Sequence, residues 1–373
     1  MSPPAIGRTA LVHHWLVRRR GGEKCLESFS RLLPGSDLFT LVHDEQACPA
    51  PPEVARVITS KLQRRTAPRH FRAWLPRFPK LYGELDLSGY DLVLTSDASV
   101  AKTVQVPEGV PHLCYCYSPV RYAFDMREVY LKQSVPGPLR PVARVLLDRI
   151  AEADRQASRR VTRFIAISRH VARRIERAYE RDAEIVYPPA DTEYYQPGPV
   201  REEDPRRPYL VLGEAVAYKR FDLAVEACRE LDRDLIVAGR GPHMERLKSL
   251  AGPRTRFVLE PDDETVRDLY RRCRALLFPG EEDFGIVPVE AMACGRPVIA
   301  LGLGGAAETV VDGETGVLYS DPDLPGLINA ITRFEVEENS FAESNAVQRA
   351  GMFSVHAHES AMRRVLEDFR DPL

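Results

Sequence analysis

Short apolar runs alternate with helical patterns through the second half of the chain, and this alternation constrains the fold more than any other feature. The runs, several of them ending at or beside glycine, occupy residues 209–213, 234–239, 255–259, 274–278 and 296–301. Apolar strands separated by helices of about ten residues pair in parallel, because each crossover returns the chain to the same edge of the sheet. We therefore expect a doubly wound α/β sheet.

The first half shows the same alternation with longer insertions. Strands are expected at 9–16, 37–42, 91–96, 112–117, 163–168 and 184–187, and helices at 23–33, 138–160 and 169–180. The polar, proline-rich stretch 197–208 resembles a linker. We therefore predict two Rossmann-like domains, residues 1–190 and 191–355, facing each other across a ligand cleft. Residues 356–373 contain a helix that could cross back to the first domain.

Composition is that of a globular protein, with 373 residues, 44% hydrophobic and 28% charged. Apolar stretches are all shorter than the roughly 20 residues that span a bilayer, and the first residues lack a signal core, so we expect a cytoplasmic protein. The seven cysteines are scattered, which predicts reduced, buried thiols. Since no set of residues has metal-ligand spacing, we expect neither a metal nor another cofactor.

Charge is divided unequally along the chain. Residues 1–189 carry 30 basic and 20 acidic residues, whereas residues 190–373 carry 22 and 34. Segment 61–82 contributes seven basic and four aromatic residues to the first half. This composition favours contact with an anionic membrane surface. A nucleic-acid site and a solvated helix with an aromatic inner face are the alternatives, and because no nucleic-acid-binding fold accompanies the segment, we expect no nucleic-acid partner.

An acidic loop and a helix start follow the strand at 274–278. Glu282 lies in the loop and Glu290 lies about one turn into the helix, so their carboxylates could accept hydrogen bonds from two sets of hydroxyl groups. A helix that begins near Gly285 presents the backbone N–H groups of Gly285, Ile286 and Val287, which suit a diphosphate. Two solvated acids near a helix start are the structural alternative.

This segment resembles the signature of retaining family-four glycosyltransferases, in which Glu, any residue, Phe-Gly and four residues precede a second Glu. Here the pattern reads Glu282, Asp283, Phe284, Gly285 and, after residues 286–289, Glu290. Segments 217–222, 239–242, 302–308 and 312–316 are also similar to that family in order and spacing. The resemblance implies the GT-B fold, which consists of two Rossmann-like domains, and hexose transfer from a nucleotide sugar.

The resemblance also implies roles for individual residues. Glu282 would bind hydroxyls of the donor sugar, Glu290 the nucleotide ribose, and Lys219 the diphosphate. Many relatives carry Arg five residues before that lysine, where this chain has Glu214, so Arg220 or Arg240 would supply a second cation. The remaining donor-binding candidates are Gly21, Gly22, Gly239, Gly241, Phe284, Gly285, Ile286 and Val287.

The first half resembles the family at two places. Gly21 and Gly22 stand at a helix start as in its N-terminal glycine loop, where missing side chains allow close approach to the backbone. Segment 114–122 is similar to a stretch that in relatives reads Tyr-Cys-His-Ser-Pro-x-Arg-Tyr. Tyr117 replaces the histidine, and Arg121 either meets an anionic acceptor or pairs with Asp125.

Bacterial surface-polysaccharide enzymes, including mannosyltransferases, are the relatives that these segments resemble most. The expected reaction is therefore retaining transfer of mannose from GDP-mannose to a hydroxyl of a lipid-linked or saccharide acceptor, at the inner face of the membrane. A UDP-hexose is the second donor to consider. A nucleotide-sugar epimerase and a non-catalytic sugar-nucleotide sensor are the alternatives of other classes.

Overall fold

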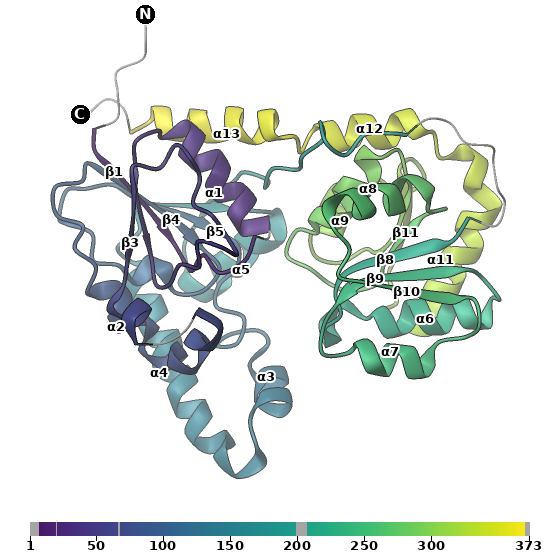
Figure 1. Ribbon diagram of the computed structural model, residues 1–373, viewed down its shortest axis with the longest axis horizontal. Helices are drawn as coiled ribbons and strands as arrows, with labels where there is room; N and C mark the ends of the chain where they lie inside the picture. The colour runs from purple at the N-terminus through teal and green to yellow at the C-terminus, as the bar shows by residue number, and fades with distance from the viewer. Residues whose placement is uncertain (1–6, 20, 66–67, 199–206, 370–373) are drawn as a thin grey trace, which may run out of the picture. The chain divides into compact units, whose positions relative to one another are not determined.

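The protein is described by a computed structural model that covers residues 7–19, 21–65, 68–198 and 207–369 (Figure 1). Two compact units divide the chain. Unit 1 comprises Met1–Pro189 and His358–Leu373, and unit 2 comprises Ala190–Ala357. Most of the linker expected at 197–208 lies outside the described residues.

Unit 1 is built on a seven-stranded sheet whose paired strands are all parallel, in the order β3-β2-β1-β4-β5-β6-β7. Its strands are β1 (Thr9–His13), β2 (Asp37–Thr40), β3 (Arg56–Thr59), β4 (Leu92–Asp97), β5 (His112–Cys116), β6 (Arg163–Ala166) and β7 (Ala183–Ile185). Its α-helices are α1 (Gly21–Leu32), α2 (Phe78–Gly83), α3 (Arg127–Ser134), α4 (Arg140–Ser158), α5 (Arg169–Tyr179) and most of α13 (Val355–Glu367).

Unit 2 contains a six-stranded sheet, also with every pair parallel, in the order β10-β9-β8-β11-β12-β13. Its strands are β8 (Tyr209–Glu214), β9 (Leu235–Arg240), β10 (Thr255–Leu259), β11 (Leu276–Phe278), β12 (Val298–Leu301) and β13 (Gly316–Tyr319). Its α-helices are α6 (Phe221–Glu230), α7 (Met244–Leu250), α8 (Asp263–Arg272), α9 (Ile286–Ala293), α10 (Ala306–Thr309), α11 (Leu324–Glu337) and α12 (Glu343–Gly351).

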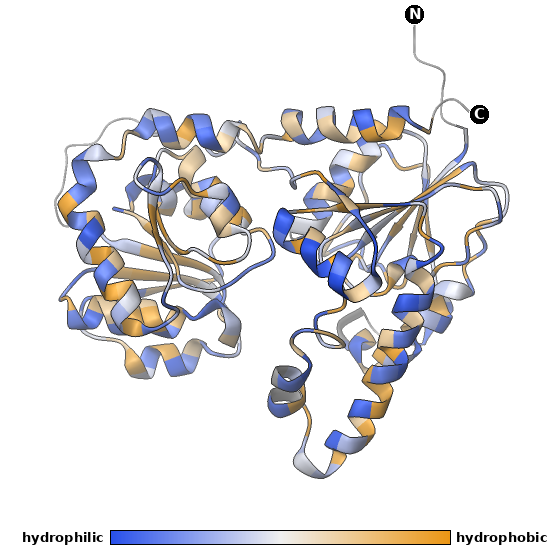
Figure 2. Ribbon diagram, turned by 180° about the vertical axis from the view of Figure 1, so that it is seen from behind, coloured by the Kyte–Doolittle hydropathy of each residue, from blue (hydrophilic) through white to orange (hydrophobic). Residues whose placement is uncertain are grey.

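The prediction of two doubly wound Rossmann-like domains is confirmed. Strands of both sheets are mainly hydrophobic, as Figure 2 shows, and their side chains form a separate apolar core in each unit. In each sheet the strand order reverses once, between β1 and β4 in unit 1 and between β8 and β11 in unit 2. Ligands of such sheets bind beyond the carboxyl ends of the strands at this reversal.

Segment 61–82 does not form the single solvated helix that was one alternative in the sequence analysis. It folds as two 3₁₀ segments, η1 (Lys61–Arg64) and η2 (Pro68–Arg77), followed by the short helix α2. Pro68, Pro76 and Pro79 account for this, because proline donates no backbone hydrogen bond and interrupts a longer α-helix. The sequence interpretation also missed the strands β3 and β13 and the helices α3, α10, α11 and α12.

All seven cysteines are free and buried, as predicted. Among the described residues, the helices are too short or too polar to cross a membrane.

Candidate functional site

The reversal in the sheet of unit 2 brings together the turns that follow β8 and β11. After β8 the chain forms a 3₁₀ turn, η5 (Ala217–Lys219), and after β11 it forms the loop that contains Glu282. Gly280 makes this approach close, because a Cβ atom at this position would lie 2.6 Å from Cα of Lys219. The sequence analysis did not single out Gly280, whose role depends on a turn about 60 residues away.

Lys219 and Glu282 form an ion pair at this point, with 3.0 Å between Nζ and Oε1. The two side chains are only 14% and 19% exposed. Burial by itself would lower the pKa of Lys219, but the negative charge of Glu282 outweighs it and the pKa is raised. The lysine is therefore a fixed, mostly desolvated cation, and such a cation interacts strongly with an anion.

Helix α9 begins directly after the acidic loop. Gly285 precedes it in the left-handed conformation, with φ of 81°, which glycine adopts without strain. The positive end of the helix dipole therefore lies at Ile286 and Val287. Phe284 is buried beneath this turn.

Glu290 lies one turn into α9 and is buried. Its carboxylate accepts a hydrogen bond of 3.0 Å from the hydroxyl of Tyr270 on α8. The Tyr270 ring is in turn contacted edge-on by Tyr195, with 5.6 Å between ring centroids. Tyr270 thus orients Glu290, a role that sequence spacing does not reveal because the two residues come from different helices.

The glycines of segment 302–308 allow this segment to pack closely against the loop that contains Glu282. Gly305 donates its backbone N–H to the carbonyl oxygen of Glu282 at 2.8 Å. A Cβ atom on Gly305 would lie 2.2 Å from Cα of Phe284, and one on Gly304 would lie 2.3 Å from the oxygen of Glu282. These two glycines hold the loop of Glu282 in place.

Gly239 and Gly241 shape the end of β9 beside β8. Their φ angles are 127° and 149°, and a Cβ atom on either would lie within 2.5 Å of a backbone oxygen of Gly213 or Ala215. Arg240, between them, pairs with Glu260 at 2.6 Å.

Arg220 directly follows Lys219 and has a left-handed backbone, with φ of 52°. Its guanidinium lies 3.3 Å from Asp222 and donates to the carbonyl of Pro322. It also lines a cavity of about 230 Å³ together with His243 and Arg246. Both cations considered as substitutes for the missing arginine, Arg220 and Arg240, therefore already have carboxylate partners.

Unit 1 has a cavity of about 490 Å³ at the corresponding reversal of its own sheet. Residues that follow β1, residues that follow β4 and the start of α1 contribute to its lining, including Gly22 and Tyr117. The walls combine the aromatic rings of Trp15 and Phe71 with charged groups of both signs; the latter are Arg18, Glu23, Asp44 and Arg72. Aromatic rings and charged groups of both signs together suit a polar ligand with apolar ring faces, such as a sugar.

Tyr117 takes part in a chain of hydrogen bonds in the wall of this cavity. Its hydroxyl lies 3.0 Å from the carbonyl oxygen of Gly22 and 2.9 Å from Oγ of Ser96. Ser96 in turn lies 2.9 Å from Nδ1 of His13, whose Nε2 is 3.4 Å from Glu23. Gly21, one residue before Gly22, starts α1. The histidine expected from the family pattern is thus replaced by a tyrosine that joins a hydrogen-bonded network.

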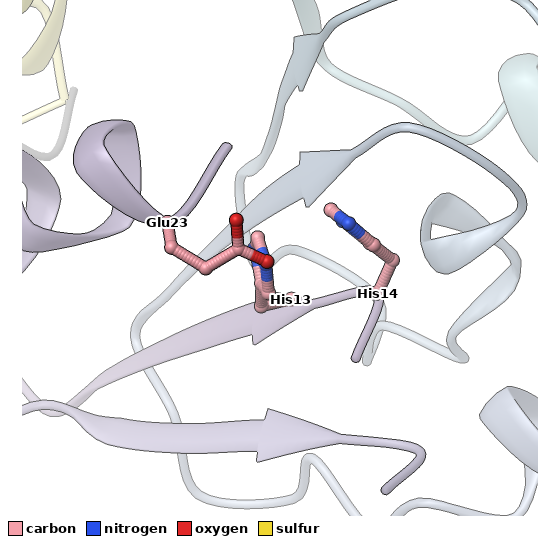
Figure 3. Close-up of side chains that lie close together, drawn as sticks. All are labelled: His13, His14 and Glu23. Atoms are coloured by element: carbon pink, nitrogen blue, oxygen red, sulfur yellow. The ribbon is translucent and has the colours of Figure 1, made fainter. Parts of the chain in front are cut away.

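Figure 3 shows His13, His14 and Glu23, whose potential ligand atoms all lie within 4.8 Å of one another. All three are buried, and the spacing would also suit a small divalent cation. Burial and the neighbouring His13 lower the pKa of His14 to about 3, so its imidazole is neutral at physiological pH. The sequence analysis did not single out this cluster, although two adjacent histidines at the end of a strand were a visible signal.

Buried ion pairs fix the end of β4, next to the cavity. The ammonium of Lys102 lies 2.8 Å from Asp97 on β4 and 2.7 Å from Asp154 on α4, and all three side chains are inaccessible to solvent. Burial would lower the pKa of Lys102, but the two carboxylates outweigh it and raise the pKa well above its usual value. The cation therefore ties the strand to the helix.

Arg121 lies partly buried in the turns after β5. Asp125, the partner considered for Arg121, forms an ion pair with Arg174, with 2.5 Å between Oδ2 and Nε.

The aromatic residues of segment 61–82 are mostly buried. Phe71, Phe78 and Tyr82 lie in the core of unit 1, and Trp74 is partly buried. The aromatic rings of this segment therefore pack inward, as expected for a segment with an aromatic inner face and a solvated outer face. Its described basic side chains are exposed; that of Arg69 lies outside the described residues.

Comparison with known proteins identifies both halves of the chain. Residues 20–194 match the model of Glycosyltransferase Family 4, and residues 197–349 match that of Glycosyl transferases group 1. One curated relative is the GDP-mannose-dependent alpha-(1-6)-phosphatidylinositol monomannoside mannosyltransferase of Mycolicibacterium smegmatis. It is 32% identical over 220 residues, which cover 51% of this chain and 56% of the relative. The chain spans less than two thirds of the length of the curated relatives that it matches.

Solved structures share the fold over nearly the whole chain. Sucrose-phosphate synthase from Thermosynechococcus elongatus has a TM-score of 0.73 at 19% identity, covering 97% of this chain and 98% of that one. HepE of Anabaena, in a complex with UDP and glucose, has a TM-score of 0.67 at 18% identity, covering 97% and 100%. With its two family matches and its two Rossmann-like units, the chain belongs to the family-four glycosyltransferases of the GT-B fold.

Proposed function

We propose that the protein is a retaining glycosyltransferase that moves a hexose from a nucleoside diphosphate to an acceptor hydroxyl. The observation that carries the proposal is the mostly buried Lys219–Glu282 ion pair at the reversal of the unit 2 sheet, beside the start of α9. A cation, a helix start and two carboxylates are the groups that a diphosphate joined to two sugars requires.

Each group has a proposed part in donor binding. Lys219 and the first N–H groups of α9 bind the diphosphate. Glu282 accepts hydrogen bonds from hydroxyls of the transferred sugar, and Glu290, oriented by Tyr270, accepts them from the ribose. Gly239 and Gly241 keep the neighbouring strand end free of side chains.

The chemistry is electrostatic. As the bond between the anomeric carbon and the phosphate oxygen breaks, negative charge grows on the diphosphate, and Lys219 and the α9 dipole stabilise it. The acceptor hydroxyl then attacks the same face of the sugar, and the departing phosphate oxygen takes the proton of that hydroxyl. Configuration at the anomeric carbon is thereby retained, and the proposal requires neither a covalent sugar-enzyme intermediate nor a metal ion.

Mannose from GDP-mannose is the first donor to test. The relative from Mycolicibacterium smegmatis is named as GDP-mannose-dependent, which supports this choice. A UDP-hexose is the second, because HepE, which shares the fold, is solved with UDP-glucose.

The acceptor is proposed to bind in the 490 Å³ cavity of unit 1. The ring of Trp15, which packs against Phe71 with 4.9 Å between the ring centroids, could stack on a sugar face, and Glu23 and Asp44 could accept hydrogen bonds from its hydroxyls. Arg18 and Arg72 could bind a phosphate, which suits a lipid-linked saccharide at an anionic, cytoplasmic membrane surface in polysaccharide biosynthesis.

One experiment separates this function from its alternatives. The full chain is incubated with GDP-mannose or UDP-glucose, with and without a lipid-linked saccharide acceptor, and the products are identified by NMR. Transfer that depends on the acceptor and retains the anomeric configuration supports the proposal. Conversion of the donor alone would indicate an epimerase, and tight donor binding without turnover would indicate a sensor.

A further inference from the structure

Helices α3 and α4, with the 3₁₀ turn η4 (Gly137–Leu139) between them, form a hairpin that extends away from the sheet of unit 1 (Figure 1). Large hydrophobic side chains are exposed along it. Those of Leu139, Val142 and Val145 are 57%, 61% and 53% exposed, and Tyr130 on α3 is 38% exposed. Among the described residues of unit 1, the only other exposed large hydrophobic residue is Ile185.

Three of the exposed residues lie close together around the start of α4. Leu139 ends η4, and Val142 and Val145 follow it in the first turns of α4. Because they are spaced three apart, they lie within about 120° of one another around the helix axis. Figure 2 shows hydrophobic and hydrophilic residues alternating along α4. An exposed apolar stripe on a helix rimmed by polar residues is typical of an interaction surface.

Polar contacts join the two helices of the hairpin. Arg144 of α4 pairs with Glu128 of α3 at 2.9 Å, and Arg127 of α3 pairs with Asp148 of α4 at 2.7 Å. Arg140 donates to the carbonyl oxygens of Val135 and Lys132, closing the end of α3. The apolar stripe is therefore presented by a defined structure.

Positive charge surrounds the base of the hairpin. Helix α4 packs against η2 and α2, the elements that carry the basic segment 61–82. A cavity of about 240 Å³ lies there, bounded by Trp74 and by four cations and one carboxylate; these are Lys61, Arg65, Arg77, Lys80 and Glu84. Cations near an anionic bilayer attract it, while apolar side chains enter the headgroup boundary.

We propose that the α3–α4 hairpin inserts its apolar stripe into the surface of an anionic lipid bilayer, with the cations of segment 61–82 binding the lipid headgroups. A second copy of the chain fits less well, because a symmetric contact through this face would bring the two basic segments towards each other. The proposal rests on the proposed function to the extent that a lipid-linked acceptor gives membrane docking a purpose. The proposal assigns insertion to the apolar residues of the hairpin, whereas the sequence analysis expected membrane contact at segment 61–82.

Vesicle binding by the full chain tests the proposal without donor or acceptor, so its outcome is independent of the transfer reaction. The double variant Val142→Asp, Val145→Asp is compared with wild type by co-sedimentation on vesicles of phosphatidylcholine with about one third phosphatidylglycerol. We expect at least a tenfold loss of partitioning, since each change places a charge and removes apolar surface. The control is Leu259→Asp, Val336→Asp, two residues that are 54% and 83% exposed on unit 2 and should leave binding unchanged.

A second measurement reports insertion directly. Val142→Cys or Val336→Cys is labelled with a polarity-sensitive fluorophore, which reacts selectively because the seven native cysteines are buried. The emission should shift to the blue at position 142 and stay constant at position 336 when anionic vesicles are added. Unchanged emission at 142, equal binding of the double aspartate variant, or a hairpin-dependent dimer in sedimentation velocity without vesicle binding would each overturn the proposal.

Discussion

Nζ of Lys219 lies 3.0 Å from Oε1 of Glu282, and both side chains are mostly buried beside the start of α9. Glu282 therefore neutralises the cation that is proposed to bind the diphosphate. An arriving diphosphate would compete for that cation and leave the carboxylate available to the sugar hydroxyls. The ion pair thus links the two proposed parts of the donor site.

Replacing Lys219 tests the diphosphate assignment. In Lys219→Ala, kcat should fall by about a hundredfold or more, because the charge acts on the leaving diphosphate in the transition state. The affinity for the donor should fall by much less. The control is Lys248→Ala, in which an exposed lysine that pairs with Glu245 is removed from the same unit. Near-normal turnover of Lys219→Ala would refute the assignment.

The two motif acids should respond differently in calorimetry. Glu290→Ala should weaken binding of both the free nucleoside diphosphate and the intact donor, because a ribose contact is common to both ligands. Glu282→Ala should preserve nucleotide binding, since it releases Lys219 from its partner, and should reduce transfer. Tyr270→Phe should cause a smaller nucleotide loss of the same kind as Glu290→Ala, about tenfold for one hydrogen bond. Equal nucleotide losses for Glu282→Ala and Glu290→Ala would contradict these roles.

Gly305 should be essential to the shape of the acidic loop. A Cβ atom there would lie 2.2 Å from Cα of Phe284, so Gly305→Ala must displace backbone rather than a flexible side chain. We expect donor binding and transfer to be lost, together with a lower melting temperature. Gly351→Ala at the end of α12 is the matched control, because a Cβ atom there meets no atom within 4 Å. If Gly305→Ala bound donor normally, the packing argument would be wrong.

Buried histidines make unit 1 sensitive to acid. Burial lowers the pKa of His112 to about 3 and that of His358 to about 4, so both stay neutral in the folded protein. The unfolded chain binds protons at these residues below pH of about 6.5. Their contribution to stability is therefore complete above that pH and is lost as the pH falls towards 4, at up to about 1.4 kcal/mol per pH unit for each histidine.

Urea unfolding between pH 6.5 and 5 measures this slope. His358→Gln can still donate to the carbonyl of Tyr187, which His358 contacts through Nδ1 at 2.7 Å, and it removes one proton-binding site from the unfolded chain. The variant should show a shallower loss of stability with falling pH. His70→Gln, at an exposed position, is the control. An unchanged slope in His358→Gln would show that its burial does not govern the acid response.

The sequence by itself determined the parallel sheets, the start of α9 and the placing of Glu282 and Glu290 around it. These features follow from local rules, because hydrophobic periodicity, helix starts and motif spacing involve residues close together in the chain. The place of Gly285 at the start of this helix follows from the same local rules, because it directly precedes the first helical residue.

Only the tertiary structure decided which distant groups meet. The approach of Gly280 to Lys219, the contact of Tyr270 with Glu290 and the network from Tyr117 to Glu23 join segments that no local period relates. The tertiary structure also decided which hydrophobic side chains are buried. The aromatic rings of segment 61–82 have a composition typical of a membrane contact but pack inward, whereas Val142 and Val145 are exposed to solvent. The physical reason is that a residue's exposure depends on which elements pack against it, and this packing is a property of the whole fold.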